Sequence, residues 1–154
     1  MLKRDDKRCV ISGARILSFR DDNNGEERGK ASHVISKASL VNGKAPEIME
    51  LLDNNPLSVR AMITLTNTWD YFWDKGYISA DPNDRSTLVV CCKEFDEKVL
   101  PSKFLRIPED LEDWPPVEVF KWHNEESRRK HSDDYCIKNC RSRIEEHLNQ
   151  LTVK

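Results

Sequence analysis

One short segment, residues 68–76, constrains the fold of this chain more than any other. Its large aromatic residues Trp69, Phe72 and Trp73 stand at positions i, i+3 and i+4, which is the spacing of one face of an α-helix. Gly76 can end this helix in the left-handed conformation that glycine tolerates. Because such an apolar stripe must be buried, we expect these three aromatic side chains to belong to the core.

Two short β-prone runs precede this helix. Residues 8–13 and residues 31–36 are both rich in apolar side chains, and the first run stops at a glycine. The segment between them, residues 21–30, is polar and rich in turn formers, which is typical of a loop. We therefore expect two strands that pair antiparallel across this long loop.

The remaining elements predict a mixed architecture. Residues 45–52 favour a helix with a proline in its first turn, and residues 87–92 favour a strand. After Pro116 the apolar residues return to helical spacing, and a last helix is expected from about 133 to 151. These alternating elements predict an α+β fold with additional C-terminal helices.

Size and composition limit what such a fold can do. The 154 residues suffice for a single domain, 1–154, and the charged residues make up 34% of the chain with a formal net charge of -2. A positive field over the whole surface is excluded as the device for binding nucleic acid, so such binding needs a local cluster. No apolar run approaches the ~20 residues of a membrane helix, and we expect no membrane partner.

The five cysteines indicate a reducing compartment. Their number is odd, two of them are adjacent, and no secretion signal is visible, so we expect reduced thiols and an intracellular protein, cytoplasmic or nuclear. Cys136 and Cys140 would share a helical face, and with Cys91 and Cys92, or with His131, they have the chemistry to hold zinc. Because the usual C-x2-C spacing is missing, buried thiols are the favoured interpretation, and a zinc-stabilised interaction domain is a third hypothesis.

Among the basic runs, the cluster Arg128, Arg129 and Lys130 is the best candidate for phosphate contacts. Its three cations follow one another without an intervening acid. Most short charged runs are solvated surface, and that simpler interpretation applies to the other basic runs of this chain.

Four segments in order resemble one enzyme family. Residues 8–13 (R-C-V-I-S-G) resemble an "R-C-x-[VI]-[ST]-G" start, and residues 31–36 (A-S-H-V-I-S) resemble an "A-H-I-I-P" strand. Residues 61–78 resemble "N-G-I-x-L … H-x-x-F-D-x-G-x-I", and residues 115–124 resemble a closing "P-x-x-x-x-L-x-W-H" helix. All four patterns are those of the small branch of the HNH nucleases, and the resemblance covers roughly residues 8–124.

The resemblance implies a ββα-metal core over about residues 8–92, with a C-terminal helical extension over about 115–151. It implies a metal-dependent endonuclease that hydrolyses DNA, in which His33 is the general base. Asp70 falls at the family's second histidine, and Asp74 matches the family's aspartate. These two carboxylates are four residues apart on one helix face, and hard oxygen ligands favour Mg²⁺ or Mn²⁺ over Zn²⁺.

The chain departs from the family pattern at positions that matter for catalysis. The family's His-Asn-His triad reads His33, Ala61 and Asp70, and the residue before His33 is Ser32, which is a poor metal ligand. The alternative hypothesis is therefore a catalytically inactive module of the same fold that binds nucleic acid or a protein partner. In the simplest interpretation, His33 is structural, the two aspartates are solvated, Trp122 anchors its helix, and His123 is a surface or hydrogen-bonding residue.

Overall fold

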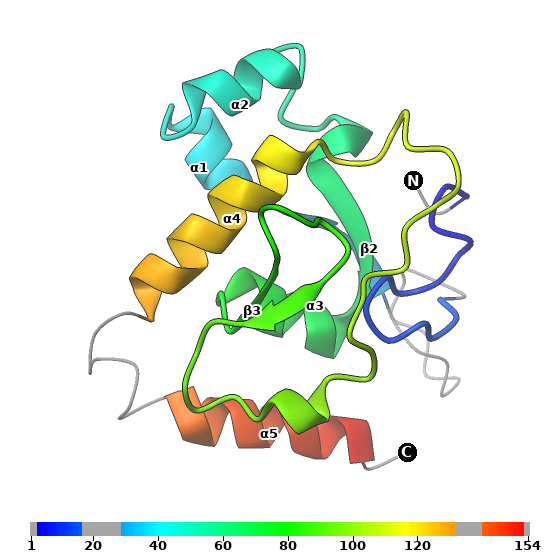
Figure 1. The fold of residues 1–154 in the computed structure, drawn as a ribbon, viewed down its shortest axis with the longest axis vertical. Coiled ribbons are helices and arrows are strands. Elements are labelled where there is room, and N and C mark those ends of the chain that lie inside the picture. The colour runs from blue at the N-terminus through cyan, green and yellow to red at the C-terminus, as the bar shows by residue number, and fades with distance from the viewer. Residues whose placement is uncertain (1–2, 17–28, 132–139, 153–154) are drawn as a thin grey trace.

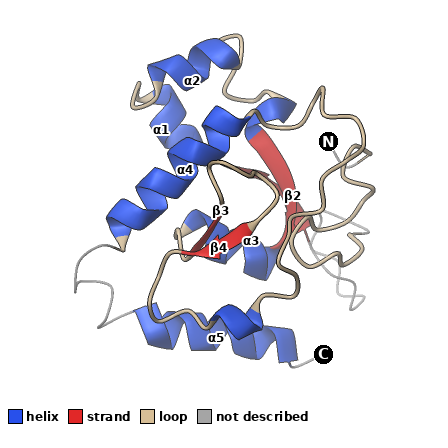
Figure 2. Ribbon diagram, in the orientation of Figure 1, coloured by secondary structure: helices blue, strands red, loops and turns tan. Residues whose placement is uncertain are grey.

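The computed structural model describes residues 3–16, 29–131 and 140–152, which form a mixed α+β fold with two small sheets (Figures 1 and 2). The elements follow in the order β1 (Gly29–His33), α1 (Lys37–Val41), α2 (Pro46–Leu51), η1 (Val59–Ala61), β2 (Met62–Thr66), α3 (Asn67–Asp74), β3 (Ile78–Ala80), β4 (Leu88–Val90), η2 (Glu97–Val99), α4 (Val117–Lys130) and α5 (Cys140–Thr152). Among the described helices, we find none with the length and apolar character needed to cross a membrane.

The first sheet and α3 form the centre of the fold. β1 pairs antiparallel with β2, from Gly29 opposite Thr66 to His33 opposite Met62. α3 begins at the residue after β2 and contacts both strands. The aromatic stripe of α3 is buried as expected, since Trp69, Phe72 and Trp73 are each at most 3% exposed.

The predicted strand at residues 8–13 is wrong. These residues form turns, with a single antiparallel bridge between Arg8 and Arg15, and Gly13 adopts a φ of +75°. Val10 and Ile11 are nevertheless buried, because the Val10 amide donates a hydrogen bond to the Thr64 carbonyl and holds the turn against β2. The true partner of β1 is therefore β2, and the expected pairing of residues 8–13 with 31–36 does not occur.

Other predicted elements agree with the structure within a few residues. The expected helix over 45–52 is α2, the expected strand over 87–92 contains β4, and the helix expected after Pro116 is α4. The last helix, expected over 133–151, is described from Cys140 onward as α5, and its first part lies outside the described residues.

The C-terminal helices pack on the central unit as expected. α4 contacts β3, and α5, at the bottom of Figure 1, contacts α3. α3 and α4 approach closely at Gly76, whose φ is +72° and where an added Cβ would stand only 3.0–3.2 Å from atoms of Ser127. Gly76 therefore ends α3 and also leaves room for α4 beside it.

An ion pair fixes the N-terminal segment to the sheet. The Asp5 carboxylate accepts hydrogen bonds from the amide and the hydroxyl of Thr64 on β2, and its side chain is fully buried. Arg4 pairs with Asp5 at 2.6 Å and also donates to the carbonyl of Met62. The surrounding hydrogen bonds compensate the cost of burying these two charges.

Candidate functional site

His33 stands at the end of β1, where a backbone carbonyl fixes its ring. Its Nε2 lies 2.8 Å from the Pro56 carbonyl oxygen. A carbonyl only accepts, so Nε2 is the protonated nitrogen and the neutral ring carries its lone pair on Nδ1. The side chain is half-buried, and the geometry gives it a defined tautomer and orientation.

Asp70 is bound by two residues of the neighbouring strand. The Ser32 hydroxyl donates to Asp70 Oδ1 at 2.5 Å, and Lys30 Nζ lies 2.8 Å from Oδ2. Lys30 and Ser32 stand two residues apart on β1 and therefore share one face of the strand. His33, the next residue, belongs to the other face, so β1 presents Ser32 rather than His33 to Asp70.

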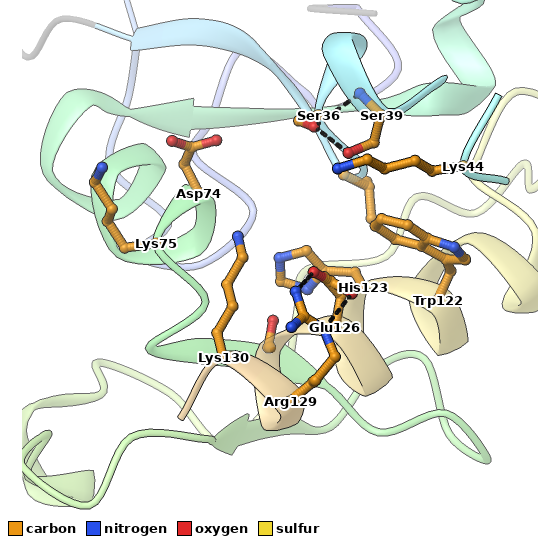
Figure 3. A pocket seen from close by; sticks show the side chains of 12 residues that line it. Ser36, Ser39, Lys44, Asp74, Lys75, Trp122, His123, Glu126, Arg129 and Lys130 are labelled. Atoms are coloured by element: carbon orange, nitrogen blue, oxygen red, sulfur yellow. Dashed lines mark hydrogen bonds and ion pairs between the residues drawn. The ribbon is translucent and has the colours of Figure 1, made fainter. Parts of the chain in front are cut away.

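Asp74 lies in a different environment, at the rim of a cleft of about 530 Å³. The cleft is bordered by α1, by the end of α3 and by the C-terminal half of α4 (Figure 3). Asp70 and His33 are not among its lining residues. The three residues predicted as catalytic or metal-binding therefore contact different groups and do not share one cleft.

Basic side chains dominate the lining of this cleft, which we call the basic cleft. Figure 3 shows the Lys44 and Lys130 ammonium groups extending into it from opposite walls. The charged residues of the lining are Lys44, Lys75, Arg129, Lys130, Asp74 and Glu126. The Lys75 ammonium group turns away from the cleft and lies 5.8 Å from the centre of the Tyr71 ring. The basic cleft thus has a positive local charge on a chain whose net charge is negative.

Glu126 is held in its charged form inside this cleft. The hydrogen bonds from Arg129 lower the pKa of Glu126 below its ordinary value, and the charges of Arg129, Lys130 and Lys44 act in the same direction. Arg129 and Glu126 form an ion pair one turn apart on α4. The side chains of Lys44 and Lys130 are therefore the main source of the excess positive charge.

His123 forms the floor of the basic cleft and is buried, so of its two expected roles, surface residue or hydrogen-bonding residue, the second is the one that the structure shows. Its Nε2 donates to the Trp73 carbonyl at 2.9 Å, and its Nδ1 accepts from the Ser79 hydroxyl at 2.7 Å. The ring also stacks on Trp73 with centroids 4.2 Å apart. Burial lowers the pKa of His123 to about 4, so the ring is neutral near pH 7 and joins α4 to α3 and β3.

The side chains of the predicted phosphate-binding cluster do not all reach the basic cleft. Arg129 and Lys130 line the basic cleft, whereas Arg128 donates to Asn124 on its own helix and is not in the lining. Trp122 is half-buried and also lines the cleft. Lys44 and Lys75 were missed in the sequence because each is an isolated lysine far from the cluster.

A second group of side chains has the chemistry of a metal site. One ligand atom each of Cys92, His131 and Cys140 lies within 4.8 Å of the other two, so these residues could hold a metal ion. The expected zinc set included Cys91, which is outside this group, and Cys136, which lies outside the described residues. Burial raises the pKa of Cys91 to about 11, so its sulfur stays protonated.

Tyr77, the residue directly before β3, contacts two members of this group. Its hydroxyl hydrogen-bonds with the Cys140 thiol, and its ring lies 5.3 Å from that of His131. Burial first, and then the neighbouring thiol, raise the pKa of Tyr77 above its ordinary value. Tyr77 therefore stays a hydroxyl and is able to donate to the sulfur.

No protein-family model, no curated protein and no solved structure matches this chain.

Proposed function

We propose that this chain is a nucleic-acid-binding module with a ββα core like that of the HNH nucleases, and that the basic cleft contacts the phosphates. The observation that carries the proposal is the basic cleft itself, a space of about 530 Å³ into which the Lys44 and Lys130 ammonium groups extend. Phosphate contacts by lysine and arginine supply most of the sequence-independent affinity for nucleic acid.

The order of the central elements supports the resemblance to the family. Two antiparallel strands, β1 and β2, are followed without a gap by α3, which packs on them. Asp70, at the family's second histidine, contacts the residue directly before His33. This is the neighbourhood in which the family holds its metal ion, between the strand and the helix.

The residues of this neighbourhood do not fit the family's metal ion. The Lys30 ammonium group already neutralises Asp70, and the Ser32 hydroxyl occupies its other oxygen. Asp74 faces the basic cleft instead. A Mg²⁺ or Mn²⁺ ion at Asp70 would require Lys30 to withdraw, so binding without metal-dependent cutting is the function that this arrangement favours.

The side chains of the basic cleft suit a nucleic-acid strand. Ammonium groups can contact successive phosphates, and the half-buried Trp122 offers an indole on which a base can stack. Because the positive charge is local on a chain of net charge -2, the binding should be weak and strongly salt-dependent.

Fluorescence anisotropy with labelled single-stranded and double-stranded DNA tests this proposal. We expect binding at low salt that falls roughly threefold to tenfold in Lys44→Ala and in Lys130→Ala, with a salt slope reduced by about one in each. Lys121→Ala is the matched control, since Lys121 is exposed on the same helix but does not line the cleft. Equal binding by all three variants would contradict the proposal.

Hydrolysis of DNA remains a second candidate, and one observation favours it. The Pro56 carbonyl holds His33 in the tautomer whose Nδ1 can accept a proton. Incubation of plasmid DNA with the purified protein and Mg²⁺, Mn²⁺, Ni²⁺ or Zn²⁺ separates the two candidates. Cutting that is lost in His33→Ala would support the nuclease function. Intact plasmid with every ion would exclude it and leave nucleic-acid binding as the proposed function.

A further inference from the structure

We propose that Cys92, His131 and Cys140 bind one Zn²⁺ ion, and that this ion fastens the start of α5 to the ends of β4 and α4. The three residues come from three separate parts of the chain. Cys92 lies two residues after β4, His131 directly follows α4, and Cys140 is the first residue of α5. A single ion bound by all three would connect these segments.

The spacing of the three ligand atoms fits three corners of one tetrahedral ion, whose fourth ligand would be a water molecule. Zinc–sulfur bonds of about 2.3 Å and zinc–nitrogen bonds of about 2.0 Å place the ligand atoms of a tetrahedral site roughly 3.5–3.8 Å apart. The ligand atoms of Cys92, His131 and Cys140 all lie within 4.8 Å of one another. A movement of about one ångström or less per side chain would therefore bring them to bonding positions.

A backbone carbonyl orients His131 as is usual for a zinc ligand. Its Nε2 lies 2.9 Å from the Lys75 carbonyl oxygen and must donate to it. The tautomer that makes this hydrogen bond has its lone pair on Nδ1, so Nδ1 is the nitrogen that would coordinate the metal. Metal-binding histidines almost always donate their second ring nitrogen to a carbonyl or carboxylate in this way.

The donor atoms select the kind of metal. Two sulfurs and an imidazole nitrogen are soft or borderline ligands, which favour Zn²⁺ over Mg²⁺ or Mn²⁺. Cys92 is only 1% exposed, so an ion bound to its sulfur would be shielded from water on that side. The site therefore differs in chemistry from the aspartates of α3.

The packing of α5 explains what the ion would do. α5 lies on α3, where His147 stacks on Tyr71 with ring centroids 3.6 Å apart. Cys140 is at the other end of α5, where its ligand atom lies within 4.8 Å of those of Cys92 and His131. Zinc at this point would hold that end of α5 in place, which is a structural role and is independent of the basic cleft.

Metal analysis of the full-length protein, purified in a reducing buffer with any affinity tag removed, tests the proposal. We expect one zinc per chain in the wild type and in Cys91→Ser, and loss of most of it in Cys92→Ser and in Cys140→Ser. Cys91→Ser is the matched control because it changes the adjacent thiol, which is outside the group. Lys130→Ala, which weakens the basic cleft, should keep its zinc.

A measurement on the unmodified protein keeps the proposal testable if the cysteine variants fail to fold. Removal of zinc with a chelator should lower the thermal midpoint by roughly 10 °C, and returned zinc should restore it. Cobalt loaded in place of zinc should show the intense near-ultraviolet absorption of thiolate–cobalt bonds. Metal-free wild-type protein whose midpoint is unchanged by chelator and by added zinc would overturn the proposal, as would zinc retained equally by Cys92→Ser and Cys140→Ser.

Discussion

The aspartates of α3 and the Cys92–His131–Cys140 group are two candidate metal sites with opposite properties. Asp70 and Asp74 are neighbours on one helix, yet Asp70 is neutralised by Lys30 and Asp74 faces the basic cleft. The ligands of the second group are far apart in the chain, yet the fold brings their atoms within 4.8 Å. Local spacing thus indicates which side chains share a face, whereas only the tertiary contacts decide which can bind one ion.

The largest expected effect is a difference in thermal stability between the protein given Zn²⁺ and the protein given Mg²⁺, which distinguishes the two sites. After a chelator has removed bound metal, we expect added Zn²⁺ to raise the thermal midpoint again by roughly 10 °C, because thiolates bind it tightly. Added Mg²⁺ should leave the midpoint of the metal-free protein unchanged, since Mg²⁺ prefers oxygen ligands and Asp70 is already paired with Lys30. Differential scanning calorimetry measures both. An equal rise of the midpoint with Mg²⁺ would indicate that the stabilising ion binds the carboxylates of α3 and not the two cysteines and the histidine.

The floor of the basic cleft should respond to acid even when no metal is bound. The pKa of His123 is about 4 in the folded protein and near 6.5 in the unfolded chain, so between these values only the unfolded chain takes up the proton. The free energy of unfolding should therefore be highest above pH 6.5 and fall by about 3 kcal/mol as the pH drops to about 4.

Denaturant unfolding in chelator-containing buffer at several pH values measures this loss. His123→Gln, which removes the titrating ring, should be less stable than the wild type at neutral pH and should lose less stability in acid. Glu126 and Asp84, whose pKa values are also lowered by hydrogen bonds, remain in both proteins and cancel in the difference. Parallel pH profiles for the two proteins would show that His123 is not the group responsible.

The smallest expected effect concerns the pair Lys30 and Asp70. Lys30 is 54% exposed and Asp70 is 18% exposed, so water screens their attraction. A double-mutant cycle with Lys30→Met and Asp70→Asn should give a coupling energy of about 0.5–1 kcal/mol. A coupling near zero in denaturant unfolding would mean that Lys30 leaves Asp70 easily and that the carboxylate is open to a cation.

The sequence predicted the helices and the buried stripe of α3 because those features are local. Trp69, Phe72 and Trp73 follow the helical period, and Gly76 ends the helix as expected. The strand at residues 8–13 was mispredicted because Val10 and Ile11 are buried by a turn rather than by a sheet. Burial, not strand geometry, explains those apolar residues.

The candidate sites were predicted only in part, because they depend on contacts between distant segments. Arg129 and Lys130 form a visible cluster, but nothing local indicates that Lys44 faces them across a cleft. His131 was recognised as one option for zinc among several, and the burial of Cys92 beside it required the fold. The pairing of Lys30 with Asp70 likewise depends on the packing of α3 against β1, two elements that are far apart in the sequence.

X-ray absorption at the zinc edge tests the central claim most directly, because it measures the atoms bound to the metal in the purified protein. We expect two sulfur neighbours at about 2.3 Å and at least one nitrogen at about 2.0 Å from the zinc. A shell made only of oxygen and nitrogen, or a protein that takes up no zinc at all, would contradict it.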